Sequence, residues 1–454
     1  MTTTPRIDPD RTHGLDDPAP KHHIGRIVAG SLLAGLVVGL LLVVAPFIQP
    51  EEADVTGAVL LGFAFGWAMM GVLSVRFSDQ PQRWVAAPAT FMGVAGLLLI
   101  WSGPDVHDVL RWVWPPALLA LVVWMITRAR RHLHSRSRRR LLYPVFAMLA
   151  LAAVGAAVET VWEAVDANAH PAPGQLVDVG DHKLHLSCTG SGSPTVVLEP
   201  GAGDYSPVFG WIAPVVARDT RVCAYDRAGR GWSEPANSPQ DAAQIATDLH
   251  RLLQRGDIPG PYVLAGHSFG GLYALTFAAR YPDDMAGMVL VDSTVPASAG
   301  TAGDNAGSSE IMTRASALLS TTARLGLGRL YSQFSYGSLP PQSRDDVRAT
   351  GSTASRLRST IDEYVQGGAS TSQAGALDDF ANKPLVVLTA GRGSEDDWIA
   401  AHDRLAKMST NSDHRMVDGA SHSSMLMVES DAAKTTQAIL DVVSAVRSSG
   451  PIKN

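Results

Sequence analysis

Cysteine and clustered metal ligands are scarce in this sequence. The 454 residues include 2 cysteines, and no Cys/His cluster has the spacing of a zinc site, so we expect no metal and no cofactor. The net charge is −6, the acidic excess lies in the second half, and no basic stripe occurs there. This balance excludes nucleic acid as an expected partner.

Charge is almost absent from five apolar runs in the first third of the chain. They cover residues 24–48, 56–75, 84–101, 109–127 and 141–162. Each run is close to the roughly 17–25 residues that cross a hydrocarbon layer. Apart from Glu159 near the end of the last run and Glu163 just after it, the runs lack the acidic and Lys groups that an ion pathway needs at mid-membrane. The sequence predicts an α-helical membrane domain over residues 24–165 with about five spans, four or six being the alternatives. It would be an anchor or a lipid-facing partner rather than a pump.

Arginine is concentrated on alternate connectors between these runs. Seven arginines lie between residues 128 and 140, and Arg76 and Arg83 lie in the connector between the second and third runs. The other connectors are acidic, with Glu51 and Glu52 in the first of them. Because positive charge accumulates on the cytoplasmic side, the pattern predicts a multi-pass protein of the cell membrane. Its N-terminus would be cytoplasmic and its C-terminal domain extracytoplasmic.

Two segments outside the apolar runs have the composition of irregular structure. Residues 1–23 are rich in Pro, Asp and His, which predicts a disordered cytoplasmic tail. Residues 166–175 contain a Pro/Ala-rich stretch that we expect to be a linker. A second domain over residues 176–454 would follow.

The motif Gly266-His267-Ser268-Phe269-Gly270 stands between an apolar stretch and a run of small residues. The first predicts a buried strand and the second a helix, which is the context that a G-x-S-x-G nucleophile elbow requires. Glycine allows the sharp turn, and the helix start supplies N–H groups to a developing oxyanion. The pattern predicts Ser268 as a nucleophile, and an ordinary Gly-rich turn is the alternative.

Strand-like and helix-like segments alternate after residue 175. The expected strands are 176–179, 183–187, 195–199, 221–225, 262–265, 287–291, 384–389 and 414–417, and the expected later helices are 239–255, 271–281, 397–407 and 432–447. Such alternation predicts the α/β class, with a mostly parallel sheet covered on both faces.

Several motifs in this region resemble those of the α/β-hydrolase superfamily. They are Val-Cys-Ala-Tyr-Asp-Arg-Ala-Gly-Arg-Gly-Trp-Ser at 222–233, Leu-Glu-Pro-Gly-Ala-Gly at 198–203, the elbow, Val-Leu-Val-Asp-Ser at 289–293 and Gly-Ala-Ser-His at 419–422. They occur in the order of the family. The resemblance implies an α/β-hydrolase sheet over residues 176–454, with a helical cap inserted at about 295–380.

The resemblance also implies roles for individual residues. Ser268 would be the nucleophile and His422 the general base. The backbone N–H groups of Phe269 and Ala202 would form the oxyanion hole. Many relatives have His-Gly where this chain has Pro200-Gly201, so the geometry of that loop is open.

The acid that would orient His422 has two possible positions. Asp292 ends the strand after the elbow helix, a position that some members use. Asp396 or Asp397 follows the next strand, where most members place the acid, although Asp397 could instead cap a helix. We prefer Asp292 and keep Asp396 and Asp397 as alternatives. Asp226 is expected to organise its own turn by hydrogen bonding rather than to take part in chemistry.

The insertion at 295–380 is expected to contain helices over 311–325 and 342–366 and to cover the site, with a disordered surface insertion as the alternative. Its apolar side chains would line the cap or form its own small core. They are Leu318, Leu319, Leu325, Leu327, Leu330, Tyr331 and Phe334.

Cys188 and Cys223 fall on strands that are antiparallel neighbours in the resembled fold. That arrangement would permit a disulfide in an outward-facing domain, and two buried free thiols are the alternative.

These patterns together predict a membrane-anchored serine hydrolase of the carboxylesterase or lipase kind. Its expected partners are a small-molecule or lipid ester substrate and membrane lipid. An acyltransferase with the same triad is one alternative, and a non-catalytic membrane sensor or scaffold with a hydrolase fold is another. The substrate and the oligomeric state are left open.

Overall fold

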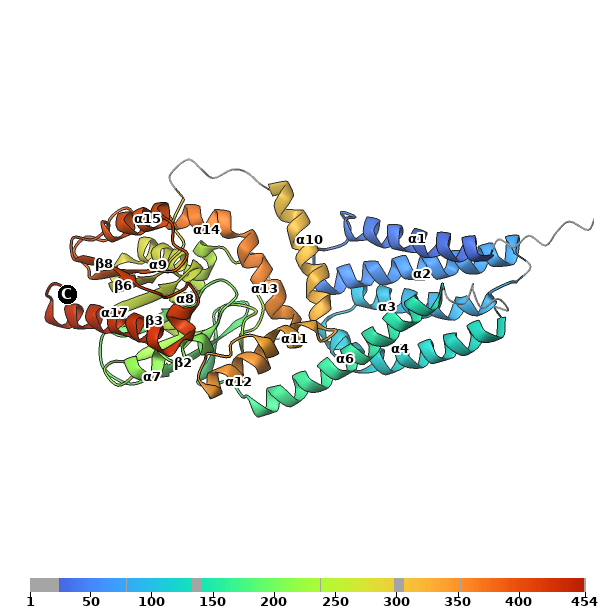
Figure 1. Cartoon of the computed structure of the whole chain (residues 1–454), viewed down its shortest axis with the longest axis horizontal. Coiled ribbons are helices and arrows are strands. Elements are labelled where there is room, and N and C mark those ends of the chain that lie inside the picture. Colours follow the sequence, from blue (N-terminus) through green and yellow to red (C-terminus); the bar gives the residue numbers. More distant parts are fainter. Residues whose placement is uncertain are drawn as a thin grey trace, which may run out of the picture. The chain divides into compact units, whose positions relative to one another are not determined.

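The computed structural model describes residues 24–78, 80–132, 141–236, 238–297, 306–351 and 353–452. The expected tail 1–23, the arginines between 133 and 140, and residues 298–305 of the insertion lie outside the described residues. The described residues form two compact units, one within 24–48 and 56–151 and the other within 49–55 and 152–452 (Figure 1).

The first unit is helical. Its elements are α1 (Ile24–Val43), α2 (Glu52–Phe77), the short η1 (Arg83–Val85), α3 (Ala86–Trp101), α4 (Pro104–His132) and the first part of α6 (Tyr143–Ala169). Within the described residues, five helical segments are long and apolar enough to cross a membrane, and they coincide with the five predicted runs. Helix α6 runs through the first residues of the expected linker and ends two residues before Pro171, since proline disfavours helical backbone in the residue before it.

Glycines allow α1 and α2 to approach closely. A Cβ on Gly62 would lie 2.4 Å from the Cα of Gly39, and one on Gly66 would lie 3.1 Å from the Cα of Gly35. Each helix therefore presents two glycines four residues apart to the other, an arrangement that lets backbones pack in an apolar medium.

The second unit is built on an eight-stranded sheet of order β1-β2-β4-β3-β5-β6-β7-β8. The strands are β1 (Gln175–Asp178), β2 (Lys183–Thr189), β3 (Thr195–Glu199), β4 (Val222–Tyr225), β5 (Tyr262–His267), β6 (Met285–Val291), β7 (Leu385–Ala390) and β8 (Ser412–Val417). Strand β2 is antiparallel to β1 and β4, and the pairs from β4 to β8 are parallel. The expected mostly parallel sheet is confirmed.

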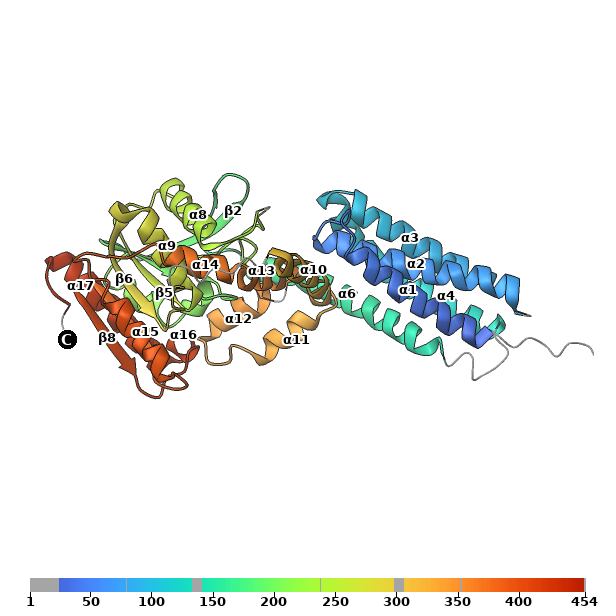
Figure 2. The same ribbon diagram turned by 90° about the horizontal axis from the view of Figure 1, so that it is seen from above.

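Helices cover both faces of this sheet because its central strands are apolar on both sides. Val197 of β3 packs in one buried cluster, whereas its neighbours Val196 and Leu198 pack in the other. The first cluster includes residues of α8 (Ala242–Arg255) and α9 (Phe269–Arg280), and the second includes residues of α7 (Ala213–Val216), α16 (Ser424–Met427) and α17 (Glu429–Ser448). Figure 2 shows α8 and α9 on one side of the sheet and α16 and α17 on the other. Alternate residues of a strand point to opposite faces, so each strand contributes to both clusters.

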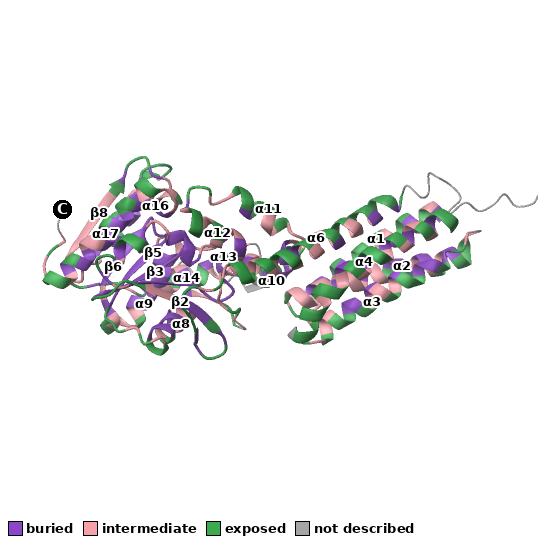
Figure 3. Cartoon of the chain, turned by 90° about the horizontal axis from the view of Figure 1, so that it is seen from below, coloured by how far each residue is buried: buried purple, intermediate pink, exposed green. Residues whose placement is uncertain are grey.

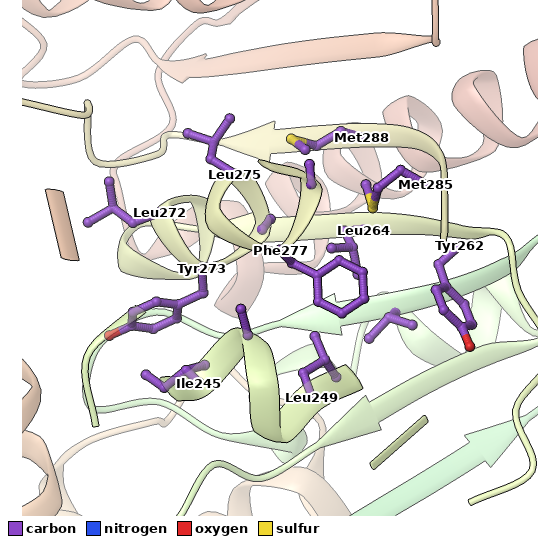
Figure 4. Packing of buried hydrophobic residues seen from close by; sticks show 14 of the residues in the cluster. Ile245, Leu249, Tyr262, Leu264, Leu272, Tyr273, Leu275, Phe277, Met285 and Met288 are labelled. Atoms are coloured by element: carbon purple, nitrogen blue, oxygen red, sulfur yellow. The ribbon is translucent and has the colours of Figure 1, made fainter. Parts of the chain in front are cut away.

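Phe277 of α9 is at the centre of the first cluster. Its ring lies among Leu249 of α8 and Tyr262 and Leu264 of β5, with the Tyr262 ring edge-on at a centroid distance of 6.4 Å (Figure 4). The side chain is fully buried. Truncation of such a residue to alanine costs about 3–5 kcal/mol, so this packing fixes the helix that follows the elbow.

Cys188 and Cys223 are directly opposite one another in the antiparallel pair of β2 and β4. They form a disulfide, with their Cα atoms 4.0 Å apart. The expectation of a bridge is thus confirmed over that of two free thiols.

The insertion contains more helices than expected. They are α10 (Ala306–Ala323), α11 (Leu327–Phe334), α12 (Pro341–Thr350), α13 (Ala354–Val365) and α14 (Gly367–Ala374). The prediction of a single helix over 342–366 is wrong, because α12 ends at Thr350 and a new helix begins after Thr353. The side-chain Oγ1 of Thr353 caps this new helix by accepting a hydrogen bond from the N–H of Arg356 at 3.3 Å.

The alternative in which the insertion's apolar residues form its own small core is wrong for most of them. Leu318, Leu319, Leu327, Leu330, Tyr331 and Phe334 are exposed, Phe334 to 91%. Figure 3 shows exposed residues along α10 and α11 in green, beside the largely purple sheet.

Candidate active site

Ser268 lies at the sharp turn between β5 and α9. Its backbone has φ 53° and ψ −123°, a conformation that costs a non-glycine residue about 1–3 kcal/mol. The turn is possible because its neighbours lack side chains. A Cβ on Gly266 would lie 2.5 Å from the carbonyl O of Gly270, and one on Gly270 would lie 2.3 Å from the carbonyl O of Glu199.

His422 follows β8 in a loop that turns at Gly419, where φ is 77°. Its Nδ1 lies 2.6 Å from Oδ2 of Asp292, and its side chain is 48% exposed. The carbonyl O of His422 lies 3.0 Å from Nε2 of His267, and the two imidazole rings have centroids 4.5 Å apart. The structure therefore brings His422 beside the residue that immediately precedes Ser268.

His267 is the residue between Gly266 and Ser268 in the elbow motif, and its imidazole is uncharged at neutral pH. Burial, together with the nearby His422, lowers the pKa of His267 to about 3. Its Nε2 must carry the proton because a carbonyl only accepts. The hydrogen bond from Nε2 of His267 to the carbonyl O of His422 thus holds the backbone of the loop that carries His422. It adds no charge beside Ser268.

Asp292 follows β6 and is the carboxylate that the structure joins to His422. Oδ1 accepts from Nε1 of Trp398 at 3.0 Å and from the N–H of Ala390 at 3.2 Å, while Oδ2 faces His422. Burial acts to raise the pKa of Asp292, but the hydrogen bonds from His422, Trp398 and Ala390 outweigh it, so the pKa is lowered. The group is therefore ionised at neutral pH.

The alternative acids have a different environment. Asp396 and Asp397 are exposed in the first turn of α15 (Asp396–Ala406). At a helix N-terminus, carboxylates stabilise the helix dipole. The residue that follows them, Trp398, is the one that reaches the site, through its bond to Asp292.

The Gly-rich loop after β3 packs against the elbow. A Cβ on Gly201 would lie 3.1 Å from Cβ of Ser268 and 3.0 Å from Nδ1 of His267. Ala202 follows at once in this loop. Phe269 begins α9, so its N–H has no carbonyl partner one turn earlier in the helix. Of the two expected oxyanion donors, Phe269 directly follows Ser268, and Ala202 directly follows Gly201, which lies against Ser268.

A buried ion cluster holds this loop, and Arg227 is its centre. Nη1 of Arg227 lies 2.8 Å from Oε1 of Glu199 and 2.7 Å from the carbonyl O of Pro200, and Nη2 lies 2.7 Å from the carbonyl O of Gly201. Its Nε lies 2.8 Å from Oε1 of Glu363. One guanidinium therefore joins the end of β3, the loop and the insertion.

The insertion reaches the elbow through α13 and α14. Glu363 of α13 also pairs with Arg230 at 2.7 Å and accepts from the N–H of Gly203 at 3.2 Å. The ring of Tyr364 lies 5.4 Å from that of Phe269 between centroids. These contacts place the C-terminal end of α13 over the turn that carries Ser268.

The cluster has unequal effects on its two carboxylates. Burial raises the pKa of Glu199 to about 7, against the opposing effect of Arg227 and Tyr225. Burial also acts to raise the pKa of Glu363, but Arg227 and Arg230 outweigh it and the pKa is lowered. Glu363 is thus the main counter-ion of both arginines.

Sequence reasoning placed Arg227 in a motif but gave it no role, and it missed Glu363. The available signal was an adjacent acidic pair, Asp362 and Glu363, in a helix of the insertion, together with two arginines in a glycine-rich turn. Asp226 has the predicted role, since it accepts from the N–H groups of Ser206 at 2.8 Å and Trp232 at 3.1 Å.

Residues 196–438 match the model of the alpha/beta hydrolase family, which is more than half of the chain. A Schizosaccharomyces pombe protein described as uncharacterized is 36% identical over 152 residues, 27% of this chain and 28% of that protein. An uncharacterized vacuolar membrane protein of Saccharomyces cerevisiae is 29% identical over 130 residues, 25% of this chain and 20% of that protein. These alignments thus span less than a third of either relative's length.

Among solved structures, the epoxide hydrolase CorEH aligns with a TM-score of 0.46 and 20% identity, over 59% of this chain and 96% of that one. The family match confirms the resemblance seen in the sequence motifs and agrees with the strand order. The chain belongs to the alpha/beta hydrolase family.

Proposed function

We propose that this hydrolase is a membrane-anchored serine esterase that forms an acyl-enzyme on Ser268. The observation that carries the proposal is the 2.6 Å contact between Nδ1 of His422 and Asp292, beside the elbow. A carboxylate at Nδ1 fixes the tautomer in which Nε2 is free to act as a base. The triad would be Ser268, His422 and Asp292.

In the first half of the proposed reaction, Oγ of Ser268 attacks the ester carbonyl carbon while Nε2 of His422 takes its proton. The N–H groups of Phe269 and Ala202 stabilise the oxyanion. Collapse of the tetrahedral intermediate breaks the bond to the alcohol, which leaves with the proton from His422. Asp292 stays ionised and stabilises the imidazolium, in keeping with its lowered pKa.

In the second half, water attacks the acyl carbon of the acyl-enzyme. His422 now accepts a proton from the water and passes it to Oγ of Ser268 as the carboxylic acid departs. The side chains thereby return to their starting protonation states.

The membrane part of the proposal is supported by the five apolar helical segments in the described residues and by the vacuolar membrane protein among the relatives. The basic connectors favour a cytoplasmic N-terminus and an extracytoplasmic hydrolase domain. We propose the domain limits 24–165 and 176–454, with the insertion at about 295–380 as the cap. The substrate would be a small-molecule or lipid ester.

A fluorophosphonate probe tests the proposal, because it reacts covalently with an activated serine. We expect the full-length protein in detergent to be labelled and Ser268→Ala to lose labelling completely. Ser444→Ala, at an exposed serine of α17, is the matched control and should label like the wild type. Absence of labelling in folded wild-type protein, or labelling that survives Ser268→Ala, would contradict the proposal.

A further inference from the structure

Helix α11 carries its apolar side chains on its exposed face. Leu327, Leu330, Tyr331 and Phe334 are 53%, 60%, 71% and 91% exposed. Their spacing of three, four and seven residues places them on one stripe, which we call the cap stripe. Ser332 on the opposite side is buried. A surface helix of a water-soluble domain has the reverse arrangement, with its apolar stripe toward the core.

Helix α10, which packs against α11, extends the exposed apolar surface. Ile311, Met312 and Leu319 are 67%, 51% and 51% exposed. Large apolar side chains exposed on two neighbouring helices are what an interaction site on a soluble protein presents.

The inward face of α11 is attached to the last turns of α6. Nε of Arg329 lies 2.9 Å from Oε2 of Glu159, and its Nη1 lies 2.8 Å from Oδ2 of Asp166. The same guanidinium lies 5.8 Å from the centroid of the Trp162 ring. Glu159, Trp162 and Asp166 lie where the apolar part of α6 ends and acidic residues begin. Tryptophan at such a point is typical of a membrane–water interface.

A second attachment, on different residues, reaches the connector between α1 and α2. Nη2 of Arg324, just before α11, lies 2.9 Å from Oε2 of Glu52, and Nη2 of Arg358 of α13 lies 2.8 Å from the carbonyl O of Pro50. This connector is also where apolar helices end. The cap is therefore tied to two separate places at which membrane-length helices leave their apolar stretch.

We propose that the cap stripe is inserted into the boundary between the lipid headgroups and acyl chains of the membrane that the five helices cross. This inference rests on the proposed membrane anchoring. The occupant is a lipid surface rather than a second copy of the chain, because both attachments hold the stripe at the level where spanning helices emerge. An amphipathic helix binds at this level with its apolar face toward the acyl chains.

If the cap stripe lies in the membrane, the proposed esterase takes its substrate from the bilayer. Helix α13 packs against α10 and carries Glu363 and Tyr364 to the elbow. The lipid-facing helices are thus part of the same cap that covers Ser268. We infer that esters dissolved in the membrane, rather than esters in water, are the preferred substrate class.

The test uses the full-length protein in vesicles of phosphatidylcholine and phosphatidylglycerol at about 3:1, a ratio that supplies anionic lipid. The environment-sensitive dye NBD is attached to Phe334→Cys and, as a control, to Lys434→Cys at an exposed position of α17. We expect blue-shifted emission at position 334 that is quenched by lipids brominated in their acyl chains, and unquenched emission typical of water at 434. Water-like emission at 334 would overturn the proposal. So would a blue shift without quenching, which would indicate a protein occupant such as a second copy.

An activity measurement separates this inference from the proposed function. The double variant Leu330→Ser with Phe334→Ser should hydrolyse p-nitrophenyl palmitate in vesicles at least about tenfold more slowly, because apolar contact with lipid is lost. Hydrolysis of p-nitrophenyl acetate in water should stay unchanged. If the double variant lost the same fraction of its hydrolysis rate on both esters, or lost none on either, the inference that the substrate enters from the membrane would be overturned. If the wild type cleaved neither ester, the proposed function would fail, while the quenching result would still decide the position of the cap stripe.

Discussion

Ser268 and Asp292 share an unusual backbone feature. Both have positive φ, 53° and 42°, and both follow parallel strands that are neighbours in the sheet. In each case the left-handed residue turns the chain sharply at the carboxyl edge, where side chains from adjacent strands meet. The His422 loop arrives at the same edge after β8. Local strain at two positions therefore orients the side chains of the proposed triad.

Replacement of the proposed acid should separate it from its alternatives. In Asp292→Asn the amide no longer favours the imidazole tautomer with a free Nε2, so we expect kcat/KM for a soluble ester to fall about 10⁴-fold. Asp396→Asn and Asp397→Asn are the matched controls and should change kcat/KM by less than about twofold. A large fall in kcat/KM in either control, with a kcat/KM near the wild-type value in Asp292→Asn, would show that the acid of the triad lies in α15.

Glu199 should make the stability of the fold depend on pH. Its ordinary pKa is 4.5, whereas burial raises the folded-state pKa to about 7. Between these values the folded state holds a proton that the unfolded state releases. The resulting stabilisation is complete below about pH 4.5 and is lost as pH rises through 7. We expect the wild-type Tm to fall relative to that of Glu199→Gln between about pH 5 and pH 8.

Thermal unfolding in detergent measures this effect, with Glu429→Gln at an exposed carboxylate of α17 as control. A Tm difference between wild type and Glu199→Gln that is constant with pH would show that Glu199 stays ionised in the folded protein.

The position of the acid illustrates where sequence reasoning at residue level stops. Asp292 follows β6, and Asp396 and Asp397 follow the neighbouring strand β7, so strand order alone takes both candidates to the same edge. The difference arises in the loops, where Trp398 and Ala390 bind Asp292. Such contacts depend on loop geometry that no local pattern encodes.

Helix α13 of the insertion is joined by buried charge to Arg227, Arg230 and the Gly-rich loop beside the elbow. Removing one partner of a buried ion pair leaves the other uncompensated, at a cost of about 3–5 kcal/mol. In Glu363→Gln, Arg227 and Arg230 would both lose their carboxylate at this point. We expect a loss of unfolding free energy of that size and slower fluorophosphonate labelling of Ser268, because the loop of Ala202 loses its support.

The matched control is Asp345→Asn in α12, whose pair with Arg344 is partly exposed. Exposed pairs contribute about 0–1 kcal/mol, so this variant should unfold like the wild type. Chemical unfolding in detergent compares the two. A similar small effect for both variants would show that the buried cluster does not hold the cap.

The helices and strands whose limits could be predicted from the sequence are those that are buried in the hydrophobic core. The strand at Thr195–Glu199 has the predicted limits because all of it is buried and its three central residues, 196–198, are apolar. The cap helices follow weaker signals. The sequence predicted no helix over Leu327–Phe334, and the apolar composition of this segment does not say whether its side chains face a core or a lipid. The pairing of Arg227 with Glu363 spans 136 positions, beyond any local pattern.

At the scale of the whole molecule, the charge asymmetry of the connectors predicts one topology. Alkaline phosphatase folds only outside the cytoplasm, so a fusion after residue 452 should be active and one after residue 78 inactive. β-Galactosidase fused at the same points should give the reverse result, since it is active only inside. Activity of both phosphatase fusions, or of neither, would contradict the multi-pass arrangement with a cytoplasmic N-terminus.

The bridge between Cys188 and Cys223, 35 positions apart, closes a covalent ring. Within that ring lie β3 and the segment of Ala202 that faces Ser268. A single protease cut there would open the backbone without releasing either piece. The nicked molecule would migrate as one band in electrophoresis until a thiol reagent separated the two pieces. Backbone damage beside the proposed nucleophile would therefore stay hidden in an oxidising compartment and be revealed by reduction.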